Sequence, residues 1–386
     1  MKILILGADG YLGWPTAMYL NKKFKKSKIF LLDNFVKRKI EFEQGVKSLF
    51  SENTIIEKLN RWNKMFPKKK MYFIKNDLLN NKNLYENIKK IKPNVIIHYA
   101  EQPSAPYSMI GREEAVFTQQ NNVIGTLNLI FAIKKYCPDC HLVKLGTMGE
   151  YGTPNIDIEE GYLNIKHNGR KEKTLFPKNP GSIYHLSKVH DSANLYLLSK
   201  IWNLKCTDLN QGVVYGSDTE ETLLDEKFKS SFHYDHIFGT ILNRFIAQVV
   251  TNSPLLVYGS GNQVRSFLNI KDTLRCIELA IKNPAKEGEM LIRNQFTEIF
   301  KLSDLALKVK NAAKKINIKA KIKKIINPRI EMEGHYYNPK NRSFKLIGLK
   351  PTKLNEETLI QMITNIIPYK RIINKNLFSP KTKWKL

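Results

Sequence analysis

Short apolar runs alternate with helical periods over the first two hundred residues. Strands are expected at Lys2–Gly7, Lys28–Asp33, Met71–Asp77, Asn94–Ala100 and His141–Thr147, which are short and rich in buried-strand residues. Helices are expected between them, over Leu12–Lys23, about Gly45–Phe66, Asn83–Lys90 and Glu113–Tyr136, with an extra helix in the long excursion from Asn34 to Lys70. This alternation predicts an α/β fold, a Rossmann-type doubly wound parallel sheet.

The pattern is less regular in the second half of the chain. Elements are expected at Lys205–Gly216, Phe228–Asn252, Arg265–Ile270, Thr273–Ile281, Glu289–Gln295 and Leu302–Ile316. We predict that residues 1–212 form the Rossmann domain and that residues 213–386 mostly form a smaller, interleaved substrate-binding lobe with a basic C-terminal tail. Segments near 239–250 and 265–285 are expected to return to the first domain.

A glycine-rich turn follows the first expected strand. Gly7, Gly10 and Gly13 give the spacing GxxGxxG between that strand and the first expected helix. Such glycines allow a tight turn, close approach of the backbone to a pyrophosphate, and close packing of the helix on the sheet. We therefore predict a dinucleotide site that includes Gly7, Asp9, Gly10, Tyr11, Leu12 and Gly13.

An acidic residue at the end of the second expected strand indicates which dinucleotide binds. Asp33 lies 20 residues after Gly13, where a carboxylate accepts a hydrogen bond from a ribose 2′-hydroxyl and repels a 2′-phosphate, which favours NAD over NADP. Lys37 and Arg38 lie nearby and could instead hold a phosphate. Asp77 is placed to receive the adenine amino group or to cap a helix. The further cofactor-binding candidates are Asn34, Arg38, Asp77, Leu78, Ala100, Gln102 and Asn121.

A second motif carries acid–base chemistry. Tyr184 and Lys188 are four residues apart and share one face of a helix, so the Lys188 ammonium can lower the pKa of the Tyr184 phenol from about 10. A phenolate can then take a hydroxyl proton while a hydride leaves the same carbon for nicotinamide. Thr147, at the end of the fifth expected strand, would donate a hydrogen bond to the reacting oxygen.

Together these motifs resemble the extended short-chain dehydrogenase/reductase superfamily of NAD-dependent epimerases and dehydratases. Longer segments resemble UDP-sulfoquinovose synthases: residues 101–109, 119–128, 144–161, 184–192, 208–216 and 294–298. The resemblance implies conversion of UDP-glucose and sulfite to UDP-sulfoquinovose, a sulfolipid headgroup donor, through 4-keto and 4-keto-5-ene intermediates with tightly held NAD. It also implies a homodimer, a sugar-nucleotide-binding second lobe and, in plants, a glutamate-synthase-like protein that delivers sulfite.

One departure concerns the acid pair of the related 4,6-dehydratases. These enzymes carry Thr-Asp-Glu where this chain has Thr147-Met148-Gly149. Glu150, His185 and Glu101 are candidate replacements, and His185 suits proton transfer because its reference pKa is about 6.5. His185 could equally be a packing residue, and Glu150 could cap or pair behind the strand.

The resemblance also implies a clamp for the UDP diphosphate, for which arginine is well suited. Arg265 and Arg329 are the main candidates, and Asn210 and Gln211 follow a strand as the sugar- and phosphate-binding pair does in relatives. The complete list of substrate-binding candidates is Thr147, Asn210, Gln211, Arg244, Gln263, Arg265, Arg329 and His335. In the insertion between Tyr151 and Ile183, Asn168-Gly169 predicts a tight hairpin, which either covers the sugar pocket or is a plain surface hairpin.

Composition and charge narrow the classes of protein to which this chain can belong. The 386 residues include 63 basic and 35 acidic side chains, a net charge of +28; this would suit a non-catalytic RNA-binding Rossmann protein, but the lysines are spread along the chain, so we expect no nucleic-acid partner. No apolar stretch approaches the roughly 18 residues of a membrane span. Cys137-Pro138-Asp139-Cys140 lacks a second ligand pair, so no metal is expected. With four cysteines and an immediate first strand, we expect a cytoplasmic or plastid-stromal enzyme. A sugar-nucleotide epimerase or 4,6-dehydratase is the alternative activity.

Overall fold

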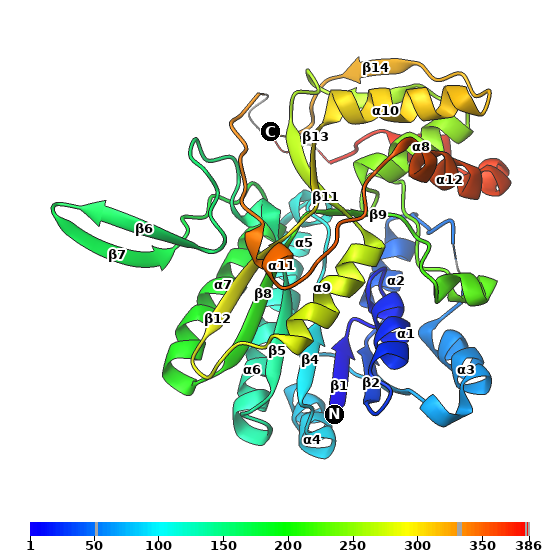
Figure 1. Ribbon diagram of the computed structural model, residues 1–386. Coiled ribbons are helices and arrows are strands. Elements are labelled where there is room, and N and C mark those ends of the chain that lie inside the picture. The colour runs from blue at the N-terminus through cyan, green and yellow to red at the C-terminus, as the bar shows by residue number, and fades with distance from the viewer. Residues whose placement is uncertain (51–52, 330–333, 383, 385–386) are drawn as a thin grey trace.

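A parallel sheet lies at the centre of the molecule (Figure 1), which is a computed structural model that describes residues 1–50, 53–329, 334–382 and 384. Among these residues the sheet has seven strands in the order β12-β8-β5-β4-β1-β2-β3. They are β1 (Lys2–Leu6), β2 (Lys28–Asp33), β3 (Tyr72–Lys75), β4 (Val95–His98), β5 (His141–Thr147), β8 (Lys205–Gln211) and β12 (Met290–Gln295). The expected Rossmann-type doubly wound sheet is confirmed, and the strand ends differ from the expected ones by at most a few residues.

Helices cover both faces of this sheet because the side chains of its strands alternate between two apolar layers. In β1, Ile3 and Ile5 pack with α1 (Gly13–Lys23), α3 (Ile55–Met65) and α9 (Ile270–Lys282). Leu4 and Leu6 face the opposite layer. That layer includes α4 (Asn81–Ile91), α6 (Gly125–Tyr136) and α7 (Ile183–Trp202), and α5 (Arg112–Gln119) joins α6 through a π-helical segment at Gln120–Ile124.

The segment between β2 and β3 holds two helices, which confirms the extra helix predicted there. They are α2 (Val36–Glu43) and α3. The expected helix over about Gly45–Phe66 begins ten residues later, at Ile55, because Thr54 caps it: the Thr54 hydroxyl accepts from Glu57 N, and the Glu57 carboxylate accepts from Thr54 N at 2.6 Å. This reciprocal capping box sets the start of the helix.

Much of the second lobe packs in a separate apolar core above the sheet. Here α8 (Ile241–Val250), α10 (Leu302–Lys315) and α12 (Glu356–Ile366) pack with β10 (Leu255–Tyr258), which pairs with β14 (Ile322–Ile325). Every residue of α8 after Ile241 is buried, and its apolar residues pack in a core that also includes Ile40, Phe50 and Tyr107 from the first half of the chain. In contrast, α9 packs against α1, and β12 joins the edge of the main sheet beside β8.

A small sheet connects the two parts, in the order β13-β11-β9. Its strands are β9 (Val213–Tyr215), β11 (Val264–Asn269) and β13 (Glu298–Lys301), and the short helix α11 (Arg342–Leu346) lies near β12. Short 3-10 turns occupy Pro67–Lys69, Tyr107–Met109, Met148–Glu150, Thr222–Leu224, Glu226–Phe228, Ile367–Ile372 and Lys375–Phe378. Among the described residues, no helix is long and apolar enough to cross a bilayer. Lys383 and Lys385 of the expected basic tail lie outside the described residues.

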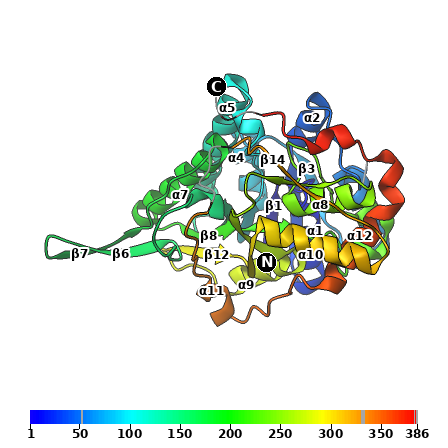
Figure 2. The ribbon, with the colours of Figure 1, turned by 90° about the horizontal axis from the view of Figure 1, so that it is seen from above.

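The insertion after β5 forms the expected hairpin. Strands β6 (Tyr162–His167) and β7 (Arg170–Leu175) pair antiparallel around Asn168 and Gly169, whose φ angles of 47° and 76° suit a tight turn. The hairpin projects away from the body in both views (Figures 1 and 2). Most of its side chains are exposed. Of the two expected roles, the hairpin therefore has that of a surface hairpin and does not cover the sugar pocket.

Candidate active site

A crevice of about 960 Å³ lies at the carboxyl ends of the parallel strands, where open α/β sheets bind their ligands. One wall comes from the turn between β1 and α1, the end of β2 and the loop after β4. The other wall comes from the end of β5, the start of α7 and the second lobe. The crevice therefore brings the predicted dinucleotide and acid–base residues to one place.

The glycine turn has the shape that a dinucleotide cradle needs. A Cβ atom on Gly7, whose φ is 77°, would lie 2.6 Å from the Tyr99 carbonyl carbon, and one on Gly13 would lie 2.2 Å from Gly7 O. A Cβ on Gly10 would meet only Gly7 O, at 3.3 Å. Gly7 and Gly13 thus allow close packing, and Gly10 leaves its crevice side open to an anion.

Asp33 holds the glycine turn in place and keeps acceptor capacity toward the crevice. Its carboxylate accepts hydrogen bonds from Asp9 N at 2.8 Å and from Phe35 N at 2.7 Å. Burial raises the pKa of Asp33, although these two N–H groups oppose the shift. A carboxylate has about four lone-pair sites, so the carboxylate can still accept from ribose hydroxyls.

The two cations that suggested NADP have protein partners. Arg38 forms an ion pair with Asp9 and donates to Asn53 O at 2.8 Å. Lys37 contacts Glu41 and lies 2.8 Å from His233 Nε2. The site therefore fits NAD, which has no 2′-phosphate.

Most of the other cofactor candidates line the crevice. Asn34, Asp77, Leu78, Ala100 and Asn121 do so, as do Asp9, Tyr11 and Leu12, and Asn34 Nδ2 donates to Asp77 Oδ2 at 2.9 Å. Gln102 does not: it is 1% exposed, and its amide donates to Thr118 Oγ1 at 2.9 Å and to Ser104 O at 3.1 Å. Gln102 holds the loop after β4 in shape and is not at the crevice wall.

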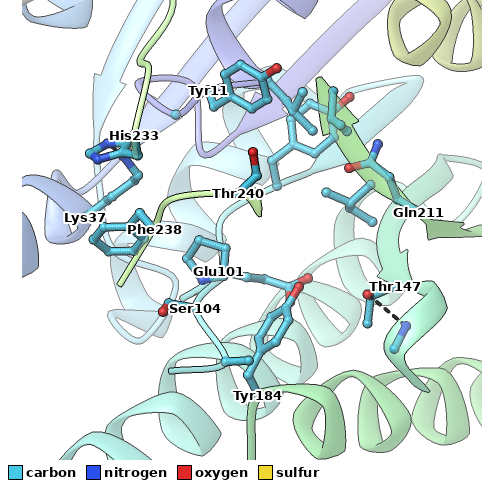
Figure 3. A pocket seen from close by; sticks show the side chains of 18 of the residues that line it. Tyr11, Lys37, Glu101, Ser104, Thr147, Tyr184, Gln211, His233, Phe238 and Thr240 are labelled. Carbon is cyan, nitrogen blue, oxygen red and sulfur yellow. Dashed lines mark hydrogen bonds between the residues drawn. The ribbon is translucent and has the colours of Figure 1, made fainter. Parts of the chain in front are cut away.

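Tyr184 lines the crevice near Glu101 (Figure 3), and Lys188 lies behind it. The Lys188 ammonium is 5.8 Å from the centre of the Tyr184 ring, donates to Leu145 O at 2.6 Å and forms an ion pair with Glu101. We expected this ammonium to lower the phenol pKa. In this structure burial, and then the Glu101 carboxylate, raise the pKa of Tyr184, because Glu101 compensates the charge of Lys188.

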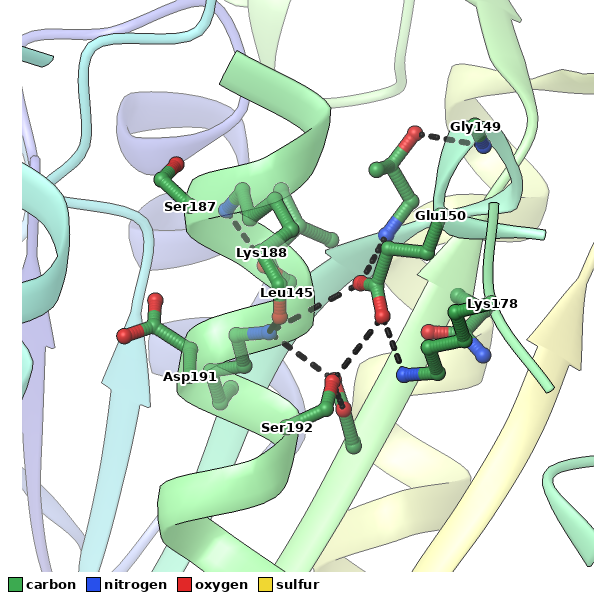
Figure 4. Close-up of polar contacts among 12 residues, drawn as sticks. Leu145, Gly149, Glu150, Lys178, Ser187, Lys188, Asp191 and Ser192 are labelled. Carbon is green, nitrogen blue, oxygen red and sulfur yellow. Dashed lines mark hydrogen bonds and ion pairs between the residues drawn. The ribbon is translucent and has the colours of Figure 1, made fainter. Parts of the chain in front are cut away.

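Thr147 and Glu150 occupy the two sides of the end of β5. Thr147 lines the crevice, and its hydroxyl accepts from Gly149 N at 3.1 Å (Figure 3). Glu150 is fully buried on the far side, where it contacts Lys178, accepts from Thr147 N at 3.1 Å and from Ser192 Oγ at 2.9 Å (Figure 4). Burial opposes ionisation, but Lys178 and then Lys144 lower the pKa of Glu150 to about 2. Glu150 is therefore an ionised support for β5, and it does not reach the crevice.

His185 occupies the space that a side chain at position 149 would fill. A Cβ on Gly149 would lie 2.4 Å from His185 Nε2, and His185 Nδ1 lies 2.9 Å from Ser182 Oγ. Burial, and then the charges of Arg329 and Arg265, lower the pKa of His185 to about 3. A neutral imidazole thus lines the crevice, and the absent side chain of Gly149 makes room for it.

The remaining substrate-binding candidates divide into two groups. Gln211, Arg244, Arg265 and Arg329 line the crevice; Arg244 contacts the Tyr258 hydroxyl, and the Arg329 guanidinium lies 5.1 Å from the centre of the Trp384 ring. Three candidates do not line it: Asn210 and Gln263 are fully buried, and His335 packs edge-on against Tyr337 at 5.9 Å. Asn210 Nδ2 donates to Tyr151 OH at 2.7 Å and Gln263 Nε2 to Tyr258 O at 3.2 Å, so both support the wall from behind.

Several crevice residues were not predicted from the sequence. They lie on the loop between β9 and α8, whose His233, Phe238 and Thr240 face the same crevice from the second lobe (Figure 3). This loop carries no motif of its own. Ser104 Oγ donates to Ile237 O at 2.6 Å, and this contact between residues 133 positions apart places the loop.

Comparisons with known proteins show the family of this chain. The family model described as "NAD dependent epimerase/dehydratase family" matches residues 3–292. UDP-sulfoquinovose synthase, chloroplastic, from Spinacia oleracea is 46% identical over this whole chain and 79% of that protein. UDP-sulfoquinovose synthase from Sulfolobus acidocaldarius is 38% identical over 98% of its length.

Solved structures show the same fold. UDP-glucose 4-epimerase from Thermotoga maritima with UDP-glucose matches with a TM-score of 0.69 at 18% identity, covering 97% of this chain and all of that chain. UDP-glucuronic acid 4-epimerase from Bacillus cereus, in complex with UDP-glucuronic acid and NAD, matches with the same TM-score at 20% identity, covering 95% of this chain and all of that chain. The family model defines the class as the NAD-dependent epimerases and dehydratases. Within this class, the chain belongs to the UDP-sulfoquinovose synthase family.

Proposed function

We propose that this protein converts UDP-glucose and sulfite into UDP-sulfoquinovose. The observation that carries the proposal is the grouping of Thr147, Tyr184 and a neutral His185 around one crevice beside the glycine turn. Two full-length relatives with that name support it. Bound NAD supplies a hydride acceptor that returns the hydride to the same sugar carbon at the end of the cycle. The crevice surface of Gly10 and the carboxylate of Asp33 hold the dinucleotide.

The side chains divide the proton transfers among themselves. Tyr184 accepts the proton of the carbon 4 hydroxyl in its phenolate form as that carbon is oxidised. Because the pKa of Tyr184 is raised in the ligand-free site, this role requires that the positive charge of a bound nicotinamide ring lower it. Thr147 donates a hydrogen bond to the resulting carbonyl oxygen. The ketone makes the carbon 5 proton acidic. His185 takes that proton and passes it to the carbon 6 hydroxyl, which leaves as water and gives the conjugated enone.

Sulfite then closes the cycle. It enters as bisulfite: the sulfur adds to carbon 6, and the proton of bisulfite passes through His185 to carbon 5. Tyr184 returns its proton to the carbon 4 oxygen as carbon 4 is reduced again. Arg265 and Arg329 hold the diphosphate because guanidinium groups bind phosphate oxygens in pairs. Arg244 and Gln211 complete the polar wall around the nucleotide-sugar.

The central experiment replaces the base. Tyr184→Phe is expected to bind UDP-glucose as the wild type does and to lose about 10²–10⁴-fold in turnover, measured as sulfite-dependent formation of UDP-sulfoquinovose. Tyr196→Phe, on the same helix but outside the crevice, is the matched control and should keep full turnover. Unchanged turnover of Tyr184→Phe would contradict the proposed role.

The alternative activities give other products. Release of a 4-keto-6-deoxy sugar without sulfite would favour a dehydratase, and formation of UDP-galactose would favour an epimerase. A protein of the RNA-binding alternative would bind RNA in a salt-dependent manner and show none of these activities.

We also propose a homodimer formed through α5, α6 and α7. Leu197 and Ile201 are 55% and 58% exposed and share one face of α7, and Phe131 of α6 is 46% exposed. Leu197→Glu should shift the mass measured by light scattering toward a monomer. A glutamate-synthase-like protein is the proposed source of sulfite, and the cytosol or the plastid stroma is the proposed compartment, in line with the spinach relative named chloroplastic.

A further inference from the structure

A layer of buried charges lies between α7 and strands β5 and β8 (Figure 4). Its side chains are at most 6% exposed, although buried charges are rare in proteins because water stabilises them so strongly. We call it the buried charge layer; its members are Glu101, Lys144, Glu150, Lys178, Lys188, Asp191 and Asp208.

Ion pairing accounts for all but one of these groups. Lys188 contacts Glu101, and Lys178 contacts Glu150. Lys144 lies 3.4 Å from Asp208 Oδ1. Three ammonium groups are thereby matched with three carboxylates, and the layer contains a fourth carboxyl group, that of Asp191.

Asp191 has the weakest set of polar contacts in the layer. It is fully buried; Oδ2 accepts from Thr126 Oγ1 at 3.3 Å, and Oδ1 has no hydrogen-bond partner within the described residues. Thr126 Oγ1 itself lies 3.0 Å from His98 Nε2. An ionised carboxylate with one long hydrogen bond would be much more costly at such a site than the neutral acid.

The charges that surround Asp191 come from four elements and the loop after β4. His98 lies on β4, Glu101 on that loop, Lys144 on β5, Lys188 on α7 itself and Asp208 on β8. Burial raises the pKa of Asp191 well above its ordinary value, the Glu101 carboxylate adds to the rise, and the opposing effects of Lys144 and Lys188 are smaller. Burial, through desolvation, keeps His98 neutral and lowers its pKa to about 3, so it adds no positive charge.

We propose that the carboxyl group of Asp191 carries a proton at neutral pH, so that it leaves the pairing of Lys188 with Glu101 undisturbed. With Asp191 neutral, Lys188 has a single ionised partner, Glu101, and is held behind Tyr184 by that pair and by Leu145 O. An ionised Asp191 would compete for the Lys188 ammonium and add a second negative charge behind the phenol. The effect on Tyr184 rests on the proposed function, but the protonation state of Asp191 does not.

Infrared spectroscopy of the ligand-free protein tests the protonation state directly. At neutral pH the wild type should show the carbonyl stretching band of a buried carboxylic acid, and Asp191→Asn should lack it. Asp208→Asn, which removes a carboxylate of the same layer that is paired with Lys144, should retain the band. Absence of the band from the wild type, or its persistence in Asp191→Asn, would overturn the proposal, and the wild-type spectrum decides even if a variant does not fold.

The pH profile of turnover tests the consequence for Tyr184. Because an amide resembles the neutral acid, Asp191→Asn should keep the acid limb of kcat/KM where the wild type has it. Glu101→Gln removes a carboxylate that raises the Tyr184 pKa, so its acid limb should move to lower pH by about one unit or more. An equal shift for Asp191→Asn would show that Asp191 is ionised. If no variant, nor the wild type, makes UDP-sulfoquinovose, the proposed function fails, while the infrared result stands by itself.

Discussion

Helices α1 and α7 cover opposite faces of one sheet, yet the layers beneath them differ in chemistry. Below α1, Trp14, Ala17 and Met18 pack with apolar side chains of the strands. Below α7, Lys188 and Asp191 take part in the buried charge layer. An apolar layer stabilises the fold by burial alone, whereas in a charged layer ion pairing must offset the free-energy cost of desolvation. The costly layer lies behind the acid–base residues, where the charge of Glu101 adds to burial in raising the pKa of Tyr184.

Breaking the charged layer should have the largest effect. Lys144→Met leaves Glu150 and Asp208 without the ammonium between them, so the protein should lose about 3–5 kcal/mol of unfolding free energy at neutral pH. Acidification should reduce this loss, because protonation removes the unpaired charges. Denaturant titrations at neutral and acidic pH measure it, and a loss independent of pH would contradict the electrostatic interpretation.

A cavity in the apolar layer is the matched comparison. Trp14→Leu removes a fully buried ring, whose centre lies 6.2 Å from that of the Trp62 ring and 5.8 Å from that of the Phe228 ring. The free energy of unfolding should fall by about 2–4 kcal/mol. Since no charge is involved, this cost should be the same at neutral and acidic pH. A pH-dependent cost would show that the two layers do not differ in the way proposed here.

The pairing of Gly149 with His185 predicts a local effect. In Gly149→Ala the new methyl group would overlap the imidazole ring, so His185 must move, at about 1–3 kcal/mol of overpacking and about tenfold or more in turnover. Gly181→Ala also lies at the crevice, but its Cβ would meet nothing within 4 Å, so this control should keep its turnover. Equal turnover in both variants would remove His185 from the mechanism.

Buried histidines predict a smaller, graded effect of acid. Burial lowers the pKa of His98 to about 3 and that of His141 to about 4, whereas the unfolded chain titrates near 6.5. Between these values the unfolded state binds more protons, so stability falls as the pH decreases, by up to about 1.4 kcal/mol per pH unit for each histidine. His141→Gln should make the melting temperature less sensitive to acid below about pH 6; an unchanged slope would argue against a neutral buried His141.

The sequence itself determined the parts of the protein that depend on short stretches of chain. The alternation of strands and helices, the glycine turn with Asp33, and the spacing of Tyr184 and Lys188 are all local, because periodicity and capping act over a few residues. The Asn168-Gly169 turn was predictable for the same reason.

Only the tertiary structure decided which distant side chains meet. It paired Lys188 with Glu101, placed His185 in the space beside Gly149, put Glu150 behind the strand and turned the hairpin away from the body of the molecule. These outcomes depend on how separate elements pack, and a buried charge takes its pKa from partners that no stretch of sequence identifies. The spacing of a motif therefore fixes which residues can act, while packing fixes the protonation state in which they do so.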